Sequence, residues 1–134
     1  MLNLEGKIVL ITGASSGIGQ ACAREFAKLK ANLILAARRV DRLKILSDEL
    51  EKEYQIKVNY LEFDVRNFED VQNKFDSLDS TWKNVDILIN NAGLAKGLEK
   101  VFEGKLSDWD EMIDTNLKGL LNVTRVISPT MVKK

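Results

Sequence analysis

Short apolar runs alternate with helix-periodic segments along this chain, and this alternation restricts the fold more than any other feature. Four runs have the residue types of β-strands: residues 7–12 (KIVLIT), 32–37 (NLILAA), 57–63 (KVNYLEF) and 85–90 (VDILIN). The first, second and fourth are almost continuously apolar, which is typical of strands covered on both faces. About 25 residues separate successive strands, which leaves room for a right-handed crossover helix in each connection.

Apolar residues in the intervening segments recur at the spacing of one helix face. Two such stripes are regular, namely Leu43, Leu46, Leu50 and Tyr54, and Phe68, Val71, Phe75, Leu78 and Trp82. Asp41 and Asn67 are the expected N-caps of these two helices. The order βαβαβαβα predicts the α/β class with a parallel sheet.

A last helix is predicted to begin near Ser107, with Asp110 at capping-box spacing. Its inward-facing residues are expected to be Trp109, Met112, Ile113, Leu117, Leu120 and Ile127. Pro129 lies inside this stretch and is expected to kink or end the helix, because proline removes a backbone donor.

Composition narrows the classes of partner. The chain has 134 residues, 45% of them hydrophobic, which suits one domain with a real core. Twenty basic and twenty acidic residues give zero net charge, so no overall field recruits nucleic acid or an anionic membrane surface. No signal peptide and no apolar run of the ~20 residues needed to span a membrane is found. We expect neither nucleic acid nor membrane as a partner.

Two residue counts restrict the chemistry. The single cysteine, Cys22, cannot form an internal disulfide, which fits a reducing cytoplasm; its alignment with Ile18, Phe26 and Leu29 predicts a core position. The absence of histidine excludes a Ser-His-Asp hydrolase and a histidine-rich metal site within this chain. We expect no metal.

The turn ITGASSGIG directly follows the first strand and opens a helix. Free N–H groups and the helix dipole make such a terminus an anion site. Gly13 would permit the tight turn, Gly17 the approach of a pyrophosphate, and Gly19 close packing of helix and strand, while Ser15 and Ser16 could cap the helix or bind phosphate. The alternative is a plain tight turn, and the spacing departs from the usual dinucleotide fingerprint.

The second strand ends in Ala36-Ala37-Arg38-Arg39. A carboxylate at this place would bind a ribose 2′-hydroxyl, whereas guanidiniums pair with a 2′-phosphate. If a dinucleotide binds, this favours NADP over NAD, with Arg38 as the phosphate ligand. The alternative is a solvated arginine loop that extends to Arg42.

Taken together, four motifs resemble those of the short-chain dehydrogenases/reductases: Thr12-Gly13-Ala14-Ser15-Ser16-Gly17-Ile18-Gly19, Asp64-Val65, Asn90-Asn91-Ala92-Gly93 and Asn116. The segments FDVRN, VDILINNAGLAKG and SDWDEMIDTNLKGL are most similar to the branch that oxidises 3-hydroxy acids, including serine, with NADP. The resemblance implies a Rossmann-like, doubly wound parallel sheet. It covers about the first half of a family member, so residues 1–134 would be the N-terminal part of one dinucleotide-binding domain that lacks its C-terminal strands.

The resemblance also implies roles for individual residues. Asp64 would bind the adenine amino group and Val65 the ring, while Asn90, Ala92 and Gly93 would line the ribose and nicotinamide side. The turn from Gly13 to Gly19, Ile18 included, would bind the pyrophosphate, and Thr12 would tie it to the fourth strand. Asn116 would support a proton-relaying water. The alternatives are turn residues at strand ends and, for Asn116, a satisfied asparagine on the apolar face of its helix.

The family's serine and its tyrosine followed four positions later by lysine have no match here. Tyr54 and Tyr60 are followed four positions later by Val58 and Asp64. We therefore expect this chain alone to be inactive, and its parent to be an NADP-dependent oxidoreductase acting on a small hydroxy acid or its 3-oxo partner. A non-catalytic NADP(H)-binding or sensing module, and a 3-oxoacyl thioester reductase, remain alternatives.

Two expectations concern the surface. The fourth strand would form an exposed sheet edge, and Leu117, Leu120 and Ile127 would lack part of their cover, so the segment alone should be poorly soluble or self-associate. The resemblance implies that the parent is a homo-oligomer, a dimer or tetramer, built partly on the helix that contains Leu117 and Ile127. Lys96, Glu99 and Lys100 either border the mouth of the site or are solvated loop charges.

Overall fold

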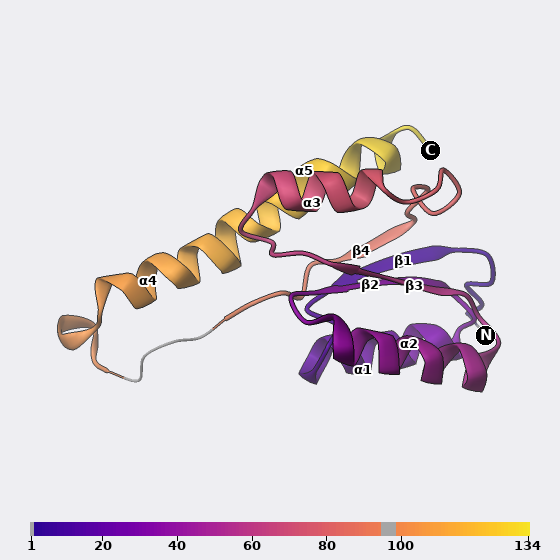
Figure 1. Cartoon of the computed structure of the whole chain (residues 1–134), viewed down its shortest axis with the longest axis horizontal. Coiled ribbons are helices and arrows are strands. Elements are labelled where there is room, and N and C mark those ends of the chain that lie inside the picture. Colours follow the sequence, from indigo (N-terminus) through magenta and orange to yellow (C-terminus); the bar gives the residue numbers. More distant parts are fainter. Residues whose placement is uncertain (1, 95–98) are drawn as a thin grey trace.

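The computed structural model describes residues 2–94 and 99–134. Within them, parallel strands form one four-stranded sheet in the order β3-β2-β1-β4, with helices on both faces (Figure 1). The strands are β1 (Ile8–Thr12), β2 (Asn32–Ala37), β3 (Val58–Glu62) and β4 (Ile87–Ile89). The helices are α1 (Gly17–Lys28), α2 (Val40–Tyr54), α3 (Phe68–Asp76), η1 (Val101–Glu103), α4 (Leu106–Ile113), η2 (Asp114–Lys118) and α5 (Gly119–Val132). The predicted Rossmann-like α/β class is confirmed.

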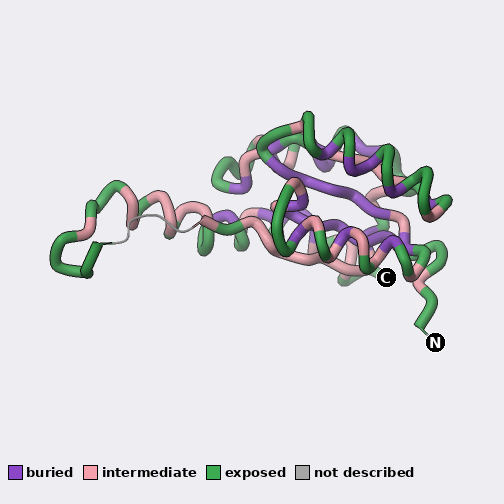
Figure 2. Tube along the Cα trace, turned by 90° about the horizontal axis from the view of Figure 1, so that it is seen from below, coloured by how far each residue is buried: buried purple, intermediate pink, exposed green. Residues whose placement is uncertain are grey.

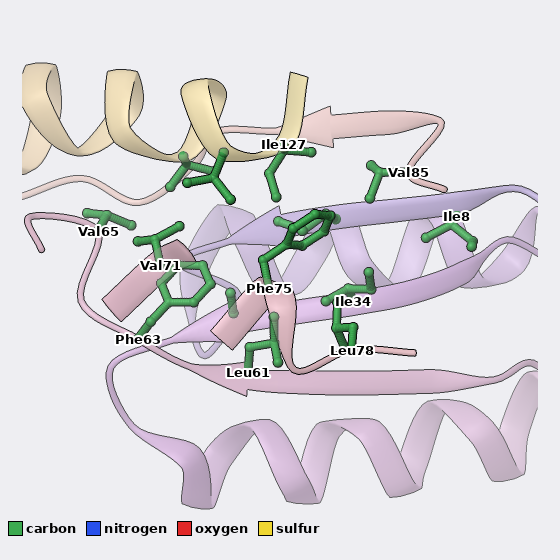
Figure 3. Packing of buried hydrophobic residues seen from close by; sticks show 14 residues of the cluster. Ile8, Ile34, Leu61, Phe63, Val65, Val71, Phe75, Leu78, Val85 and Ile127 are labelled. Atoms are coloured by element: carbon green, nitrogen blue, oxygen red, sulfur yellow. The ribbon is translucent and has the colours of Figure 1, made fainter. Parts of the chain in front are cut away.

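The central strand β1 alternates its side chains between two cores. Val9 and Ile11 pack with α1 and α2 on one face, and Leu10 packs with α3 and α5 on the other. Both faces are therefore covered, which explains why this strand is an unbroken apolar run. Figure 3 shows the second core, where Phe75 and Val71 of α3 lie beneath Ile127 of α5.

Both predicted stripes point inward, except at Phe68 at the start of α3, which is 40% exposed. Leu43, Leu46 and Leu50 are buried in α2, and Val71 and Phe75 in α3. Asn67 caps α3 as expected, since its side chain accepts a hydrogen bond of 3.1 Å from the Asp70 N–H.

The other predicted caps are wrong. Helix α2 begins at Val40 with Arg39 at the N-cap, and Asp41 lies in its first turn, where its charge still complements the helix dipole. Helix α4 begins at Leu106, so the predicted start near Ser107 is confirmed, but Lys105 occupies the N-cap position and Ser107 lies inside the helix. Ser16 occupies the N-cap position of α1 without a capping hydrogen bond.

The expected inward face of the last helix is only partly present. Ile127 is buried, but Ile113, Leu117 and Leu120 are 47%, 60% and 43% exposed. Helix α4 and the adjoining π-helical segment η2 extend away from the sheet (Figures 1 and 2), which leaves these three side chains only partly covered by the described residues. The expected lack of cover is therefore present at Leu117 and Leu120 but not at Ile127. The expectation that Pro129 ends the helix is also wrong, because α5 continues to Val132.

Helix α1 departs from its predicted face at one position. Cys22 and Phe26 pack against the core, but Ile18 is 74% exposed at the start of the helix. Over the described residues, no helix combines the length and apolar character needed to cross a membrane.

Candidate functional site

A cavity of about 660 Å³ opens at the carboxyl ends of the strands. Ligands of open α/β sheets bind at this edge, where the strand order reverses between β1 and β4. The lining residues come from every strand-to-helix connection and from η2: Gly13, Ser15, Ser16, Ala36, Ala37, Arg38, Arg39, Arg42, Phe63, Asp64, Val65, Asn91, Ala92, Gly93 and Thr115.

The glycine turn after β1 has no room for side chains at two of its positions. Gly13 has φ +63°, and a Cβ there would lie 2.9 Å from the Ala92 Cα. A Cβ on Gly19 would lie 2.2 Å from the Gly13 carbonyl oxygen. Gly17 differs, because its φ is +57° but a Cβ would meet open space. Gly13 and Gly19 therefore serve close packing, whereas Gly17 keeps the backbone of the turn accessible.

A buried hydroxyl joins this turn to the segment after β4. Thr12 Oγ1 accepts hydrogen bonds from the backbone N–H groups of Asn91 and Ala92, at 3.0 and 2.9 Å. The Asn91 side chain donates in turn to the Gly13 carbonyl, at 3.1 Å. The structural role expected for Thr12 is confirmed.

Three arginines line the end of the cavity beyond β2. Arg38 and Arg39 are exposed in the loop, and Arg42 lies three residues further, in the first turn of α2. No carboxylate lies within 4.0 Å of these three guanidiniums among the described residues, although Arg38 is close enough to Asp64 to contribute to lowering the pKa of that carboxyl. This end of the cavity is suited to bind an anion.

Asp64 lines the next part of the cavity, after β3. Its carboxylate is paired with the guanidinium of Arg66, and the Nη2–Oδ2 distance is 2.7 Å. Hydrogen bonds from this guanidinium, partly opposed by burial, hold the pKa of Asp64 below its usual range. Asp64 is therefore ionised near neutral pH and can accept further hydrogen bonds toward the cavity.

Asn116 lies in η2, where it is exposed rather than on a buried apolar face. Its side chain nevertheless has two partners, since Oδ1 accepts from the Leu94 N–H and Nδ2 donates to the Leu94 carbonyl, both at 2.8 Å. Asn116 does not line the cavity, but Thr115 beside it does. Its amide thus fixes the backbone that follows Gly93.

Most of the predicted site residues come together at this edge. Those that line the cavity are Gly13, Ser15, Ser16, Arg38, Arg39, Asp64, Val65, Ala92 and Gly93. Gly17, Ile18 and Gly19 lie next to it in the turn and the start of α1, and the Asn90 side chain points elsewhere, donating to Thr124 Oγ1 in α5 at 3.0 Å. Lys96 lies outside the described residues.

Sequence reasoning did not assign Asn91, Arg42 or Thr115 to the site. Asn91 was detectable within the Asn-Asn-Ala-Gly motif, and Arg42 by its helical spacing from Arg39. Thr115 had no local signal, because only the tertiary structure brings η2 to the cavity. No group of three acidic or cysteine side chains suited to a metal ion occurs in the part of the chain described.

The match to known proteins covers nearly the whole chain. Residues 7–134 match the short chain dehydrogenase family. The chain is 43% identical to the NADP-dependent 3-hydroxy acid dehydrogenase of Schizosaccharomyces pombe, covering 100% of this chain and 52% of that protein. It is 45% identical to sulfoacetaldehyde reductase 2 of Chromohalobacter salexigens, covering 94% and 49%. Serine dehydrogenase from Escherichia coli superposes with a TM-score of 0.87 at 42% identity, covering 94% and 56%.

The fold, with its cavity at the carboxyl ends of the strands, thus defines a Rossmann-type α/β scaffold. The chain belongs to the short-chain dehydrogenase family. It spans about half the length of the relatives it matches.

Proposed function

We propose that the intact protein is an NADP-dependent oxidoreductase that transfers a hydride between nicotinamide and the CH–OH group of a small hydroxy acid or its 3-oxo partner. The observation that carries this proposal is the cavity with three arginines at one end and the glycine turn beside it. The relatives named for NADP-dependent 3-hydroxy acid, serine and sulfoacetaldehyde chemistry support the small, polar substrate class.

The residues at the strand ends fit this cofactor. Gly17 leaves its backbone open to a pyrophosphate at the N-terminus of α1, with Gly13, Ile18 and Gly19 shaping that turn and Ser15 and Ser16 within reach. Arg38 and Arg39 would bind the 2′-phosphate. Asp64 and Val65 would contact the adenine, and Asn90, Ala92 and Gly93 would border the ribose and nicotinamide. The bound cofactor would supply the hydride.

Transfer of the hydride also requires a proton donor or acceptor at the substrate oxygen. Asn116 is the residue of this chain that we assign to the proton-transfer machinery. Its side chain fixes the Leu94 backbone next to Gly93, and the nicotinamide ring would lie beside Gly93. The 134 residues contain no tyrosine followed four positions later by lysine. We therefore propose that the proton-transferring groups are supplied outside this sequence, and that this chain alone does not catalyse the reaction.

Replacement of Arg38 by alanine tests the cofactor assignment. In the intact protein we expect affinity for NADPH to fall about ten- to hundred-fold, because one charge-assisted contact to the 2′-phosphate contributes about 1.5–3 kcal/mol. Affinity for NADH should hardly change. Arg24→Ala, which removes a guanidinium of α1 that is paired with Glu49 of α2 and does not line the cavity, is the control. Calorimetry measures both affinities, and equal losses for the two cofactors would exclude Arg38 from the phosphate site.

Substrate class is tested with a panel of hydroxy acids, their 3-oxo partners and a 3-oxoacyl thioester. We expect NADPH consumption or formation with a short 3-hydroxy acid pair such as serine. Selective turnover of the thioester would favour the 3-oxoacyl thioester reductase instead.

A non-catalytic NADP(H)-binding or sensing module is the second candidate, favoured by the missing tyrosine–lysine pair. Tight NADPH binding by the intact protein without turnover of any panel member would support it.

We also propose that the intact protein is a cytoplasmic homo-oligomer. The exposed apolar residues Leu117, Leu120 and Leu121 around the start of α5 support this, because a continuous apolar helix face usually has a protein partner. Light scattering of the intact protein would show a dimer or tetramer.

A further inference from the structure

Arg66 holds the Asp64 carboxylate with one edge of its guanidinium, the edge formed by Nε and Nη2. Nε lies 3.0 Å from Oδ1 and 3.1 Å from Oδ2, Nη2 lies 2.7 Å from Oδ2, and the Arg66 backbone N–H donates to Oδ1 at 3.0 Å. Such a forked, charge-assisted contact restricts the rotation of the carboxylate. Three N–H groups make these four contacts, because the Nε–H is shared between the two oxygens. A carboxylate has about four acceptor sites, so Asp64 can still accept a hydrogen bond from a ligand in the cavity that it lines.

The same loop is attached to the long helical segment of α4, η2 and α5 at three points. Arg66 Nη1 lies 3.8 Å from Glu111 Oε1 in α4. The Val65 carbonyl accepts a hydrogen bond of 2.9 Å from the Asn122 side chain in α5. The Val65 side chain packs on Gly119, where a Cβ would approach Val65 Cγ2 to 2.5 Å.

This helical segment also holds the opposite end of the site. Asn116, between Glu111 and Gly119, makes both of its side-chain hydrogen bonds to the Leu94 backbone, next to Gly93 of the cavity wall. The loop after β3 and the loop after β4 are therefore both held by one continuous helical element, and Arg66 is the charged contact on the side of Asp64.

We propose that Arg66 is a positioning residue that fixes the Asp64 carboxylate for recognition of the 6-amino group of the adenine base, and that Glu111 anchors Arg66 to α4. This inference rests on the proposed function, because it requires that the cavity bind an adenine dinucleotide. Arg66 does not line the cavity, so it acts through Asp64.

The competing explanation is an ordinary surface ion pair. Arg66 has a side chain 35% exposed, and pairs of that kind contribute little to stability. The chain offers a matched control, because Arg24 is paired with Glu49 at 2.9 Å, its side chain is 36% exposed, and neither residue lines the cavity. If both are ordinary surface pairs, removing Arg66 and removing Arg24 should change the free energy of unfolding by similar amounts and leave ligand preference unchanged. A positioning role predicts instead that removing Arg66 weakens recognition of the 6-amino group of adenine.

The test compares NADPH with its hypoxanthine analogue, which has a carbonyl oxygen in place of the 6-amino group. Dissociation constants of both are measured for the intact wild-type protein, Arg66→Gln, Arg66→Lys, Glu111→Gln and Arg24→Gln, with melting curves to confirm folding. Wild type should prefer NADPH at least about ten-fold, the effect of one hydrogen bond to a charged group. Arg66→Gln should reduce that preference to less than about three-fold, mainly by weakening NADPH. Arg66→Lys should retain an intermediate preference, because one ammonium group cannot hold both oxygens.

Glu111→Gln should lower the preference by about two- to three-fold, and Arg24→Gln should leave it unchanged. An unchanged preference in Arg66→Gln, or equal losses for both ligands, would overturn the positioning role. An unchanged preference in Glu111→Gln would overturn the anchor to α4. Tight binding of both ligands by wild type without preference would refute the inference while the proposed function stands. Binding of neither would refute the proposed function itself.

Discussion

Replacement of Gly19 by alanine tests the packing of the glycine turn. A Cβ at this position would lie 2.2 Å from the Gly13 carbonyl oxygen, 2.8 Å from the Gly13 carbonyl carbon and 2.6 Å from Asn91 Nδ2. Ordinary contacts between heavy atoms are roughly 3.5 Å, so the overlap with the carbonyl oxygen exceeds 1 Å. The first two of these atoms belong to the backbone, so the turn and the helix must separate to make room.

The expected cost follows from these contacts. Forcing an extra methyl group into a packed site costs about 1–3 kcal/mol, and loss of the Asn91–Gly13 hydrogen bond adds about 0.5–1.5 kcal/mol. The better helix propensity of alanine returns about 0.5–1 kcal/mol. We therefore expect Gly19→Ala to lower the free energy of unfolding by about 2 kcal/mol, which corresponds to a Tm lower by roughly 4–8 °C for an intact protein of about twice this length.

Urea and thermal unfolding, followed by circular dichroism, measure this change in the intact protein. Ile18→Ala is the control, because Ile18 is the preceding residue of the same helix and is 74% exposed. Its effect on unfolding should stay within about 0.5 kcal/mol. A Gly19→Ala protein as stable as the Ile18→Ala protein would refute the conclusion that Gly19 is required for close packing.

Two further expectations concern the second core and the amino end of the sheet. Gly119→Ala should destabilise the protein by about 1–3 kcal/mol, because the new methyl group would meet Val65 Cγ2 at 2.5 Å. The double variant with Val65→Ala should be more stable than the sum of the two single changes predicts, because the smaller side chain relieves this contact. Strict additivity of the two changes in urea unfolding would contradict the contact. Asp86 accepts hydrogen bonds from Lys134 Nζ and the Ile8 N–H, which outweigh the opposing effect of burial and hold its pKa below the usual range. The stabilising effect of ionised Asp86 is therefore present above pH ~4 and is lost as the pH falls through the lowered pKa of the folded state. Asp86→Asn should be less stable than wild type at pH 7. A difference in the free energy of unfolding that does not shrink in acid would be inconsistent with this role.

The strands and their order along the chain could be predicted because a strand that is buried on both faces needs a continuous run of apolar residues. The predicted ends of β3 and β4 were less accurate: the structure limits β4 to Ile87–Ile89, although the Asp86 N–H still donates to the Ile8 carbonyl. The N-cap of α2 was misplaced because Asp41 has the preferred chemistry, while the observed N-cap, Arg39, lies two residues earlier.

The failures in the last helix have another cause. Periodicity shows that Leu117 and Leu120 share a face, but it does not show whether this chain covers that face. The contacts of Arg66 were also inaccessible to local reasoning, since Glu111 lies 45 positions further along the chain. The glycine turn and the arginines after β2 were detectable because a strand, a turn and a helix start are adjacent in sequence.

The order of the strands in the sheet determines when the cavity at their carboxyl ends can form during synthesis. Ile8 pairs with Asn32, and Leu33 with Val58, so β1, β2 and β3 can associate through short connections. The pairing of Val9 with Ile87 can form only after β4 has been synthesised. The same holds for the hydrogen bonds that Thr12 accepts from the two N–H groups after β4. An emerging polypeptide can therefore assemble three strands well before the glycine turn gains the neighbours that hold it in shape. The cavity at the carboxyl ends of the strands is therefore one of the last features that these residues complete.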